Sequence, residues 1–205
     1  MQVSGPVTIQ VYPFRSDAEI ARARLAADGI KSAVHADDEG GLNPGFFKRY
    51  GVRLEVDASD VDDAYESLGI ERIDVPQEIA DAMFSHGGWA YPNEACGLIA
   101  VDGDGVVQMV FCLTNTHNSP HRFTIDPGEH FGCVRYADER GWTIGGVFHS
   151  HVKSESYPSP ADIDGGGDPQ WLHFIVGPVM GPSPQLRAFR LEGGYVAEVS
   201  LTVGS

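Results

Sequence analysis

Residues 143–162 read T-I-G-G-V-F-H-S-H-V-K-S-E-S-Y-P-S-P-A-D, and this stretch decides how the second half of the chain folds. Residues 143–148 form a short apolar run with β-branched members, which predicts a buried strand. Side chains two positions apart in a strand point to the same face. We therefore expect His149 and His151 to leave the end of the strand on one side and Ser150 to point the other way.

The end of the same stretch has the composition of a helix start. Ser159 is suited to the N-cap, Pro160 to the first helical position and Asp162 to the third. One interpretation is that Ser159 only caps the helix and Asp162 only complements the helix dipole. The other is that the helix start brings a carboxylate and a hydroxyl to the strand end, and the preceding H-x-H pattern favours it.

His149, His151 and Asp162 carry the types of side chain that bind zinc. Catalytic zinc sites usually use three protein ligands and leave one position for water. Two hydrogen-bonded histidines at a strand end are the alternative interpretation of H-x-H, and the pattern also occurs in unrelated metal folds. Together with an acid in reach, the pair indicates a metal site.

An acidic residue lies upstream, in the stretch P-N-E-A-C-G-L-I at residues 92–99. Glu94 alone would be interpreted as a solvated loop acid before a strand. Combined with H-x-H, seven residues, S, two residues, D, it resembles the motif of the JAMM (MPN-plus) zinc metalloproteases. Residues 115–127, 157–159 and 186–189 also resemble bacterial members, and the resemblance covers about residues 73–200.

The resemblance implies a role for each residue of the motif. His149, His151 and Asp162 would hold Zn²⁺, Glu94 would take a proton from water and pass it to the leaving amine, and Ser159 would donate a hydrogen bond to the oxyanion. The chain departs from the family pattern in two places. Val152 stands where members usually have proline, which we expect to loosen the following loop. Residues 165–169 (G-G-G-D-P) interrupt the helix after Asp162 and predict a flexible loop beside the site.

The implied activity is hydrolysis of an amide or isopeptide bond at the C-terminal tail of a ubiquitin-like or sulfur-carrier protein. The leaving amine would belong to a lysine or a cysteine, and the sequence does not choose between them. One alternative is an inert MPN-type scaffold that binds protein partners without catalysis. Another is a zinc hydrolase or deaminase acting on a small molecule, but the chain lacks the H-x-E and P-C-x-x-C patterns of zinc deaminases.

Composition limits the partners of the chain. Its 205 residues carry a net charge of −15, with 7 Lys/Arg against 12 Asp/Glu in residues 1–70 and 7 against 17 in residues 71–205. Nucleic acids and anionic membranes are disfavoured because phosphate contacts need clustered Lys and Arg. Without an export signal or a membrane-length apolar run, we expect a cytoplasmic protein.

The three cysteines, Cys96, Cys112 and Cys133, are too few and too widely spaced to suggest a disulfide framework. We expect them to be small buried apolar side chains. Cys96 lies two residues after the candidate base and is the one cysteine that could modulate it.

We expect an α+β / α/β chain of two domains, a small partner-binding module at residues 1–70 and a JAMM-type metallopeptidase domain at residues 71–205. The first resembles a small bacterial domain described as a signal-transducing module. Its pattern predicts the order βαββα, related to ferredoxin-like arrangements, with helices that begin at Ser16 and Ser59 as caps. The predicted strands are 7–14, 30–35 and 51–56, and the predicted helices are 16–27 and a segment after residue 59.

Residues 36–50 are expected to form a loop. Its acidic run at 37–39 is interpreted as solvated, with a metal site as the alternative. Its aromatic-basic cluster at 46–50 could belong to the core or dock a partner, and we expect a mixture in which core is the larger share. Residues 71–75 are the predicted junction. In the second domain we expect a curved mixed sheet flanked by helices. Its predicted helices are 76–87 and 127–140, and its predicted strands are 97–101, 106–114, 143–151, 171–176, 186–191 and 195–201.

Overall fold

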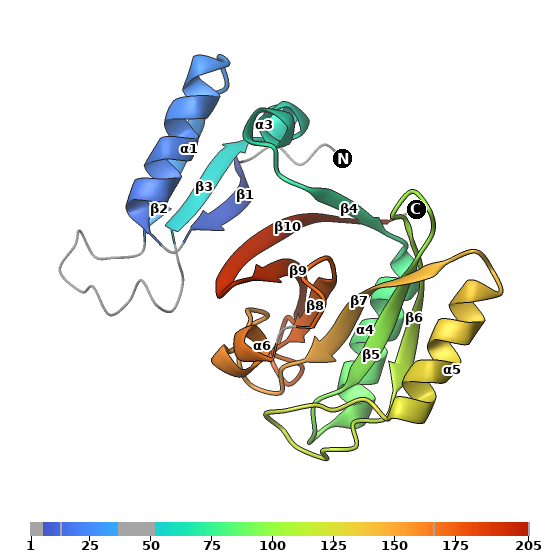
Figure 1. The fold of residues 1–205 in the computed structure, drawn as a ribbon. Helices are drawn as coiled ribbons and strands as arrows, with labels where there is room; N and C mark the ends of the chain where they lie inside the picture. The colour runs from blue at the N-terminus through green and yellow to red at the C-terminus, as the bar shows by residue number, and fades with distance from the viewer. Residues whose placement is uncertain (1–5, 13, 37–51, 166, 205) are drawn as a thin grey trace. The chain divides into compact units, whose positions relative to one another are not determined.

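The computed structural model describes residues 6–12, 14–36, 52–165 and 167–204 (Figure 1). The chain divides into two compact units, Met1–Arg72 and Ile73–Ser205. The division falls within the predicted junction at residues 71–75. Separate functions for residues 1–70 and 71–205 remain a prediction.

Within the described residues of the first unit, the elements follow the predicted βαββα order (Figure 1). The described strands pair in the order β1-β3-β2, and both pairs are antiparallel. On β3, alternate residues Val52, Leu54 and Val56 are buried, as expected for a strand with one face on a core. The elements are β1 (Pro6–Tyr12), α1 (Arg15–Ala27), β2 (Ser32–Ala36), β3 (Val52–Asp57), the 3₁₀ turn η1 (Ala58–Asp60) and α3 (Val61–Leu68).

Both predicted serine caps in this unit are wrong. Helix α1 begins at Arg15, one residue before Ser16, and the hydroxyl of Ser16 donates to the side chain of Asp17. Ser59 lies inside η1, where it donates to Asp60, and neither helix has a side-chain cap hydrogen bond. In each case the chain is already helical at the serine, so its hydroxyl lies past the position from which it could cap.

One face of α1 is buried against the core of this unit. Ala18, Ala21 and Leu25 are buried, whereas Ile20 is 69% exposed. These three follow the i, i+3, i+7 spacing of one helix face, and Ile20 lies off that face. The interpretations of residues 37–50 lie outside the described residues.

The second unit contains a sheet whose described strands run in the order β4-β10-β9-β8-β7-β5-β6. Strands β7 and β8 are parallel, and the other pairs with a resolved register are antiparallel, so the sheet is mixed as predicted. The sheet curls, with helices against it (Figure 1). The elements are β4 (Arg72–Val75), α4 (Gln77–Ala90), β5 (Cys96–Val101), β6 (Val107–Leu113), α5 (Pro127–Asp138), β7 (Thr143–Ser150), α6 (Pro160–Asp164), β8 (Leu172–Gly177), β9 (Gln185–Glu192) and β10 (Tyr195–Val203).

The predicted junction is more than a connection. Residues 72–75 form strand β4, which pairs with β10 at one edge of the sheet. Its last residue, Val75, is buried in the main core of this unit. Sequence periodicity does not reveal so short a strand, because four residues are too few to show an alternating pattern.

The two large helices contact opposite faces of the sheet. Ile79, Met83 and Ile99 belong to one core together with Phe148, so α4 covers the face to which Phe148 points. On the other face Phe111 meets Tyr136 of α5 edge to face. Neighbouring residues in a strand point to opposite sides, so His149 is on the face opposite α4.

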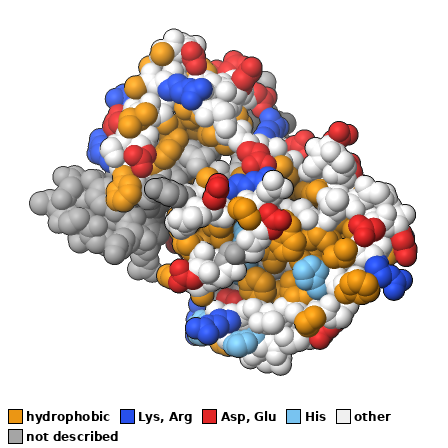
Figure 2. All heavy atoms as spheres, in the orientation of Figure 1, with side chains coloured by type: hydrophobic (Ala, Val, Ile, Leu, Met, Phe, Trp, Pro, Cys, Tyr) orange, Lys and Arg blue, Asp and Glu red, His pale blue; other side chains and the backbone are white. Residues whose placement is uncertain are grey.

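The cysteines are free, and Cys96 and Cys133 are buried as expected. Cys112 is exposed, because it lies on β6 at the edge of the described sheet. In the part of the chain that the structure describes, no helix is both long enough and apolar enough to cross a membrane. Acidic side chains are scattered over the face shown in Figure 2.

Gly97 allows β5 and β6 to approach each other. A Cβ atom at this position would lie 2.1 Å from the carbonyl oxygen of Phe111. We expect Gly97→Ala to lower the free energy of unfolding by more than about 2 kcal/mol, because backbone would have to move. The matched control is Gly88→Ala in α4, where a Cβ meets nothing within 4 Å, and which should gain roughly 0.5–1 kcal/mol. Denaturant unfolding of both variants measures the difference. Equal free energies of unfolding would contradict the close approach of β5 and β6 at Gly97.

Candidate metal centre

The two histidines of the H-x-H pattern lie at the end of a central strand. His149 is the penultimate residue of β7, and His151 follows the last residue of that strand. Strand β7 runs between β5 and β8, with His149 opposite Cys96 on one side and Ile175 on the other. This central position buries both rings, which are 0% and 3% exposed.

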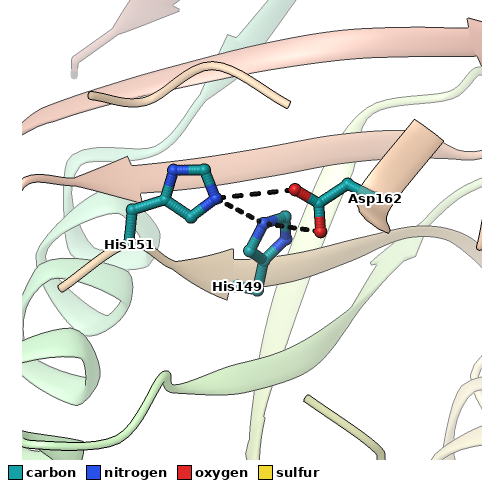
Figure 3. A group of neighbouring side chains, drawn as sticks. All are labelled: His149, His151 and Asp162. Carbon is teal, nitrogen blue, oxygen red and sulfur yellow. Dashed lines mark hydrogen bonds and ion pairs between the residues drawn. The ribbon is translucent and has the colours of Figure 1, made fainter. Parts of the chain in front are cut away.

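The side chains of His149, His151 and Asp162 point toward one another (Figure 3). The two Nε2 atoms are 3.2 Å apart. Asp162 Oδ1 is 3.4 Å from Nε2 of His149, and Oδ2 is 3.5 Å from Nε2 of His151. The structure therefore brings together the three residues for which the sequence predicts a metal site.

A capping box at the start of α6 directs the Asp162 carboxylate. The Ser159 hydroxyl accepts from the Asp162 amide at 3.3 Å, and Asp162 Oδ2 accepts from the Ser159 amide at 2.7 Å. Ser159 therefore caps the helix, and the same helix start also brings the Asp162 carboxylate to the two histidines. The helix ends at Asp164 with Gly165 at its C-cap, which agrees with the predicted interruption.

The donor set fits a divalent metal ion. Ligand atoms at zinc–nitrogen distances of 2.0–2.1 Å in tetrahedral geometry lie about 3.3 Å apart, close to the 3.2 Å between the two imidazole nitrogens. The three groups offer two neutral nitrogens and one carboxylate oxygen, a combination typical of transition-metal sites. They are the one group of this kind among the described residues.

The local charges are strongly coupled. Burial lowers the pKa of His149, against the opposing effect of Asp162. Burial also acts to lower the pKa of His151, but Asp162 and the Glu155 carbonyl outweigh it, so the pKa of His151 is raised. Burial acts to raise the pKa of Asp162, yet hydrogen bonds from the two imidazoles hold it well below its usual range. The carboxylate therefore stays ionised and able to bind a cation.

Glu94, the candidate base, is 6% exposed and lies just before β5. Burial raises its pKa to about 7, with His151 lowering the pKa and Asp162 raising it further. These electrostatic effects show that the Glu94 carboxyl lies close to the triad. A carboxyl group with a pKa near neutrality is suited to both accept and release a proton.

Two residues that the sequence analysis did not single out hold Glu94 in place. The side chain of Asn115 donates to the carbonyl of Glu94 at 3.0 Å and to that of Arg122 at 2.9 Å. The hydroxyl of Ser150 accepts from the amide of Ala95 at 2.9 Å. Asn115 is in the N-T-H-N segment that resembles the family pattern, but nothing in the sequence indicates which backbone it contacts.

Ser159, the candidate oxyanion donor, is half-buried at the N-cap of α6. Its oxygen accepts from the Asp162 amide. A serine hydroxyl also carries one proton to donate, so the capping bond leaves that donor free.

Two further aromatic rings adjoin the histidines. Phe123 stacks on His149 with ring centroids 4.9 Å apart and planes 21° from parallel. His173 on β8 is buried, and burial, with His149 nearby, lowers its pKa to about 4. Phe123 therefore provides an apolar ring beside the triad, and His173 provides one that is uncharged at neutral pH. A sequence signal existed only for Phe123, which is part of the quoted segment 115–127.

Comparisons with known proteins identify the family and the relatives of this chain. The family model for prokaryotic homologs of the JAB domain matches residues 76–192, more than half of the chain. The CysO-cysteine peptidase of Mycobacterium tuberculosis is 28% identical over 128 residues, which are 62% of this chain and 87% of that protein. The desampylase of Haloferax volcanii is 26% identical over 138 residues, which are 64% and 96% of the two chains.

A solution structure of a protein from Desulfitobacterium hafniense is also similar. It has a TM-score of 0.59 and 30% identity, and the match covers 64% of this chain and 92% of that one. The predicted fold, a mixed sheet flanked by helices, and the predicted JAMM-type enzyme class are confirmed by the structure and by relatives named as peptidase and desampylase. The chain belongs to the family of prokaryotic homologs of the JAB domain, within the JAMM/MPN proteins.

Proposed function

We propose that this chain is a zinc-dependent peptidase that cleaves the C-terminal tail of a ubiquitin-like or sulfur-carrier protein from an attached lysine or cysteine amine. The observation that carries the proposal is the convergence of two imidazole Nε2 atoms and one carboxylate within 3.5 Å of one another. Two relatives support the class of substrate, since one is a CysO-cysteine peptidase and another a desampylase.

The three convergent residues, His149, His151 and Asp162, would hold the ion. When bound, zinc supplies Lewis acidity, which makes water a better nucleophile near neutral pH and polarises a carbonyl. Both imidazoles are buried from bulk water. Metal binding requires their neutral form, so it should weaken in acid.

Glu94 would move the proton. Its carboxylate accepts a proton as the water oxygen attacks the carbonyl carbon, and the same proton passes to the amine nitrogen as the C–N bond breaks. The Ala95 amide donates to the Ser150 hydroxyl and the Asn115 side chain donates to the Glu94 carbonyl, so both bonds fix the peptide that follows Glu94. On the other side, the Glu94 amide donates to the carbonyl of Ser119 at 2.9 Å. Its position is therefore set by the fold before substrate binds.

Ser159 would stabilise the charge that develops on the carbonyl oxygen. Its oxygen is fixed by the capping bond while its proton remains available. The donor and the Asp162 ligand thus share one helix start, and one structural element positions both.

The first expected result concerns catalysis. Glu94→Gln should bind zinc as the wild type does and lose turnover by roughly 10²–10⁴-fold, because the amide cannot accept the proton. Metal analysis and cleavage of a conjugate that carries a Gly-Gly-ended carrier protein measure the two effects. Wild-type turnover in this variant would remove Glu94 from the reaction.

The second concerns the metal. Asp162→Ala should lose bound zinc, because only two protein ligands remain. Asp164→Ala is the matched control, since Asp164 is exposed on the same short helix and should keep it. Zinc content after dialysis distinguishes them, and equal content in both variants would exclude Asp162 as a ligand.

The third concerns pH and the metal-free protein. The pKa of Glu94 is about 7 in the folded chain against an ordinary value of 4.5. Between these two pH values the folded state keeps a proton on Glu94 that the unfolded state has released. The contribution of Glu94 to the free energy of unfolding therefore falls as pH rises from about 4.5 to about 7. Relative to the Glu94→Gln variant, the free energy of unfolding of the wild type should fall by on the order of 3 kcal/mol across this pH range.

Chemical denaturation of both proteins in the presence of a chelator measures this difference. The comparison with the glutamine variant cancels groups whose pKa does not depend on Glu94, so the difference reports Glu94 together with the part of the His151 titration that is coupled to it. Parallel stability curves for the two proteins would show that Glu94 is not buried as described.

A further inference from the structure

His151 needs a support that β7 does not provide. It lies beyond the last residue of that strand, and no helix or strand follows until α6 begins at Pro160. Its backbone is held by a bond from its amide to Val176 and one from the Val179 amide to its carbonyl, at 2.8 and 3.0 Å. These bonds place the main chain of His151 but leave its ring free to rotate.

The ring is oriented by one backbone carbonyl. Nδ1 of His151 lies 2.7 Å from the carbonyl oxygen of Glu155, so a proton on Nδ1 makes this bond. Nε2 on the other side of the ring faces His149 and Asp162 (Figure 3). A metal-binding imidazole commonly donates its second N–H in this way, which fixes the ring and its tautomer. The position of the Glu155 carbonyl therefore determines where Nε2 points.

The Glu155 carbonyl also accepts from the amide of Tyr157 at 2.8 Å, and Ser156, which lies between these two residues, attaches this turn to the sheet. The side chain of Ser156 is 2% exposed, and its hydroxyl lies 2.8 Å from the carbonyl of Gly177 and 2.6 Å from that of Gln185. One proton is shared between two acceptors, one at the end of β8 and one at the start of β9. The loop is thereby attached to the sheet one residue after Glu155.

The packing beneath the loop leaves little freedom. A Cβ atom at Gly177 would lie 2.8 Å from the carbonyl oxygen of Ser154 and 3.0 Å from Cβ of His151. The loop thus lies directly on the end of β8. The next residue, Tyr157, meets Phe189 edge to face at 5.4 Å and adds a second attachment to β9.

His149 is held in a different way. It is part of β7, is 0% exposed and stacks on Phe123, and its Nδ1 has no hydrogen-bond partner among the described residues. Its orientation follows from the strand and from packing. A change at Ser156 should therefore affect one imidazole and spare the other.

We propose that Ser156 is a positioning residue for the metal centre, which acts through the Glu155 carbonyl to orient His151. This inference rests on the proposed function, because it concerns the affinity of the site for zinc. The hydrogen bonds of the Ser156 hydroxyl go to β8 and β9 and not to the triad. Its effect is the preorganisation of one ligand.

Ser156→Ala tests this role. We expect the zinc dissociation constant, measured by competition with a chelator, to rise 10–100-fold, as is usual when the partner of a metal ligand is lost. Ser156→Thr keeps the hydroxyl and should restore most of the affinity. Ser154→Ala is the matched control, since Ser154 is exposed in the same loop, and it should bind zinc as the wild type does.

Nitrogen-15 NMR gives a readout that general destabilisation would not produce. In the zinc-loaded wild type the Nδ1–H proton of His151 should exchange slowly with water, and in Ser156→Ala it should exchange much faster while His149 is unchanged. If Ser156→Ala does not fold, Ser156→Cys, which keeps the volume and weakens the donor, takes its place.

Either of two results would overturn the proposal. One is a folded Ser156→Ala variant that binds zinc with wild-type affinity. The other is a His151 Nδ1–H proton that exchanges with water at the same rate in the wild type and in Ser156→Ala. A wild type that binds no zinc at all is a different result. It would refute the proposed function, whereas zinc bound equally by wild type and variant would refute only the role of Ser156.

Discussion

The reciprocal hydrogen bonds between Ser159 and Asp162 are the interaction on which the centre depends. They begin helix α6 and at the same time fix the carboxylate that faces both imidazoles. A carboxylate on a free loop would lose side-chain and backbone entropy each time it came to the site. At the third position of a capped helix, most of that cost is met when the chain folds.

The remaining constraint is electrostatic. Two buried imidazoles, an ionised aspartate and a buried glutamate lie in one region, and each changes the pKa of its neighbours. Without a cation, the negative charge of Asp162 is stabilised by hydrogen bonds from the two imidazoles. A divalent ion at the same point would satisfy the carboxylate and both nitrogens together. The fold thus keeps an acidic group ionised in a place from which water is largely excluded, a common feature of functional sites.

The parts of the site that could be predicted from sequence are those set by local rules. Strand periodicity puts His149 and His151 on one side, and N-cap chemistry puts Ser159 and Asp162 at a helix start, so both patterns can be read within a few residues. The same cap rule was wrong for Ser16 and Ser59, where the helix had already begun. Local chemistry allows a cap, but the path of the preceding chain decides whether one forms.

What could not be predicted depends on contacts between distant residues. Asn115 reaches the carbonyl of Glu94, 21 residues away, and Ser156 reaches that of Gln185, 29 residues away. Neither pairing leaves a periodic or spacing signal. Val152 illustrates the same limit, since the absence of proline there predicts a looser loop. In the structure Val152 is 5% exposed, and the residues after it are attached to the sheet by the hydroxyl of Ser156. The contacts of this loop with the sheet are therefore tertiary hydrogen bonds, which act on it in place of the backbone restriction that proline would supply.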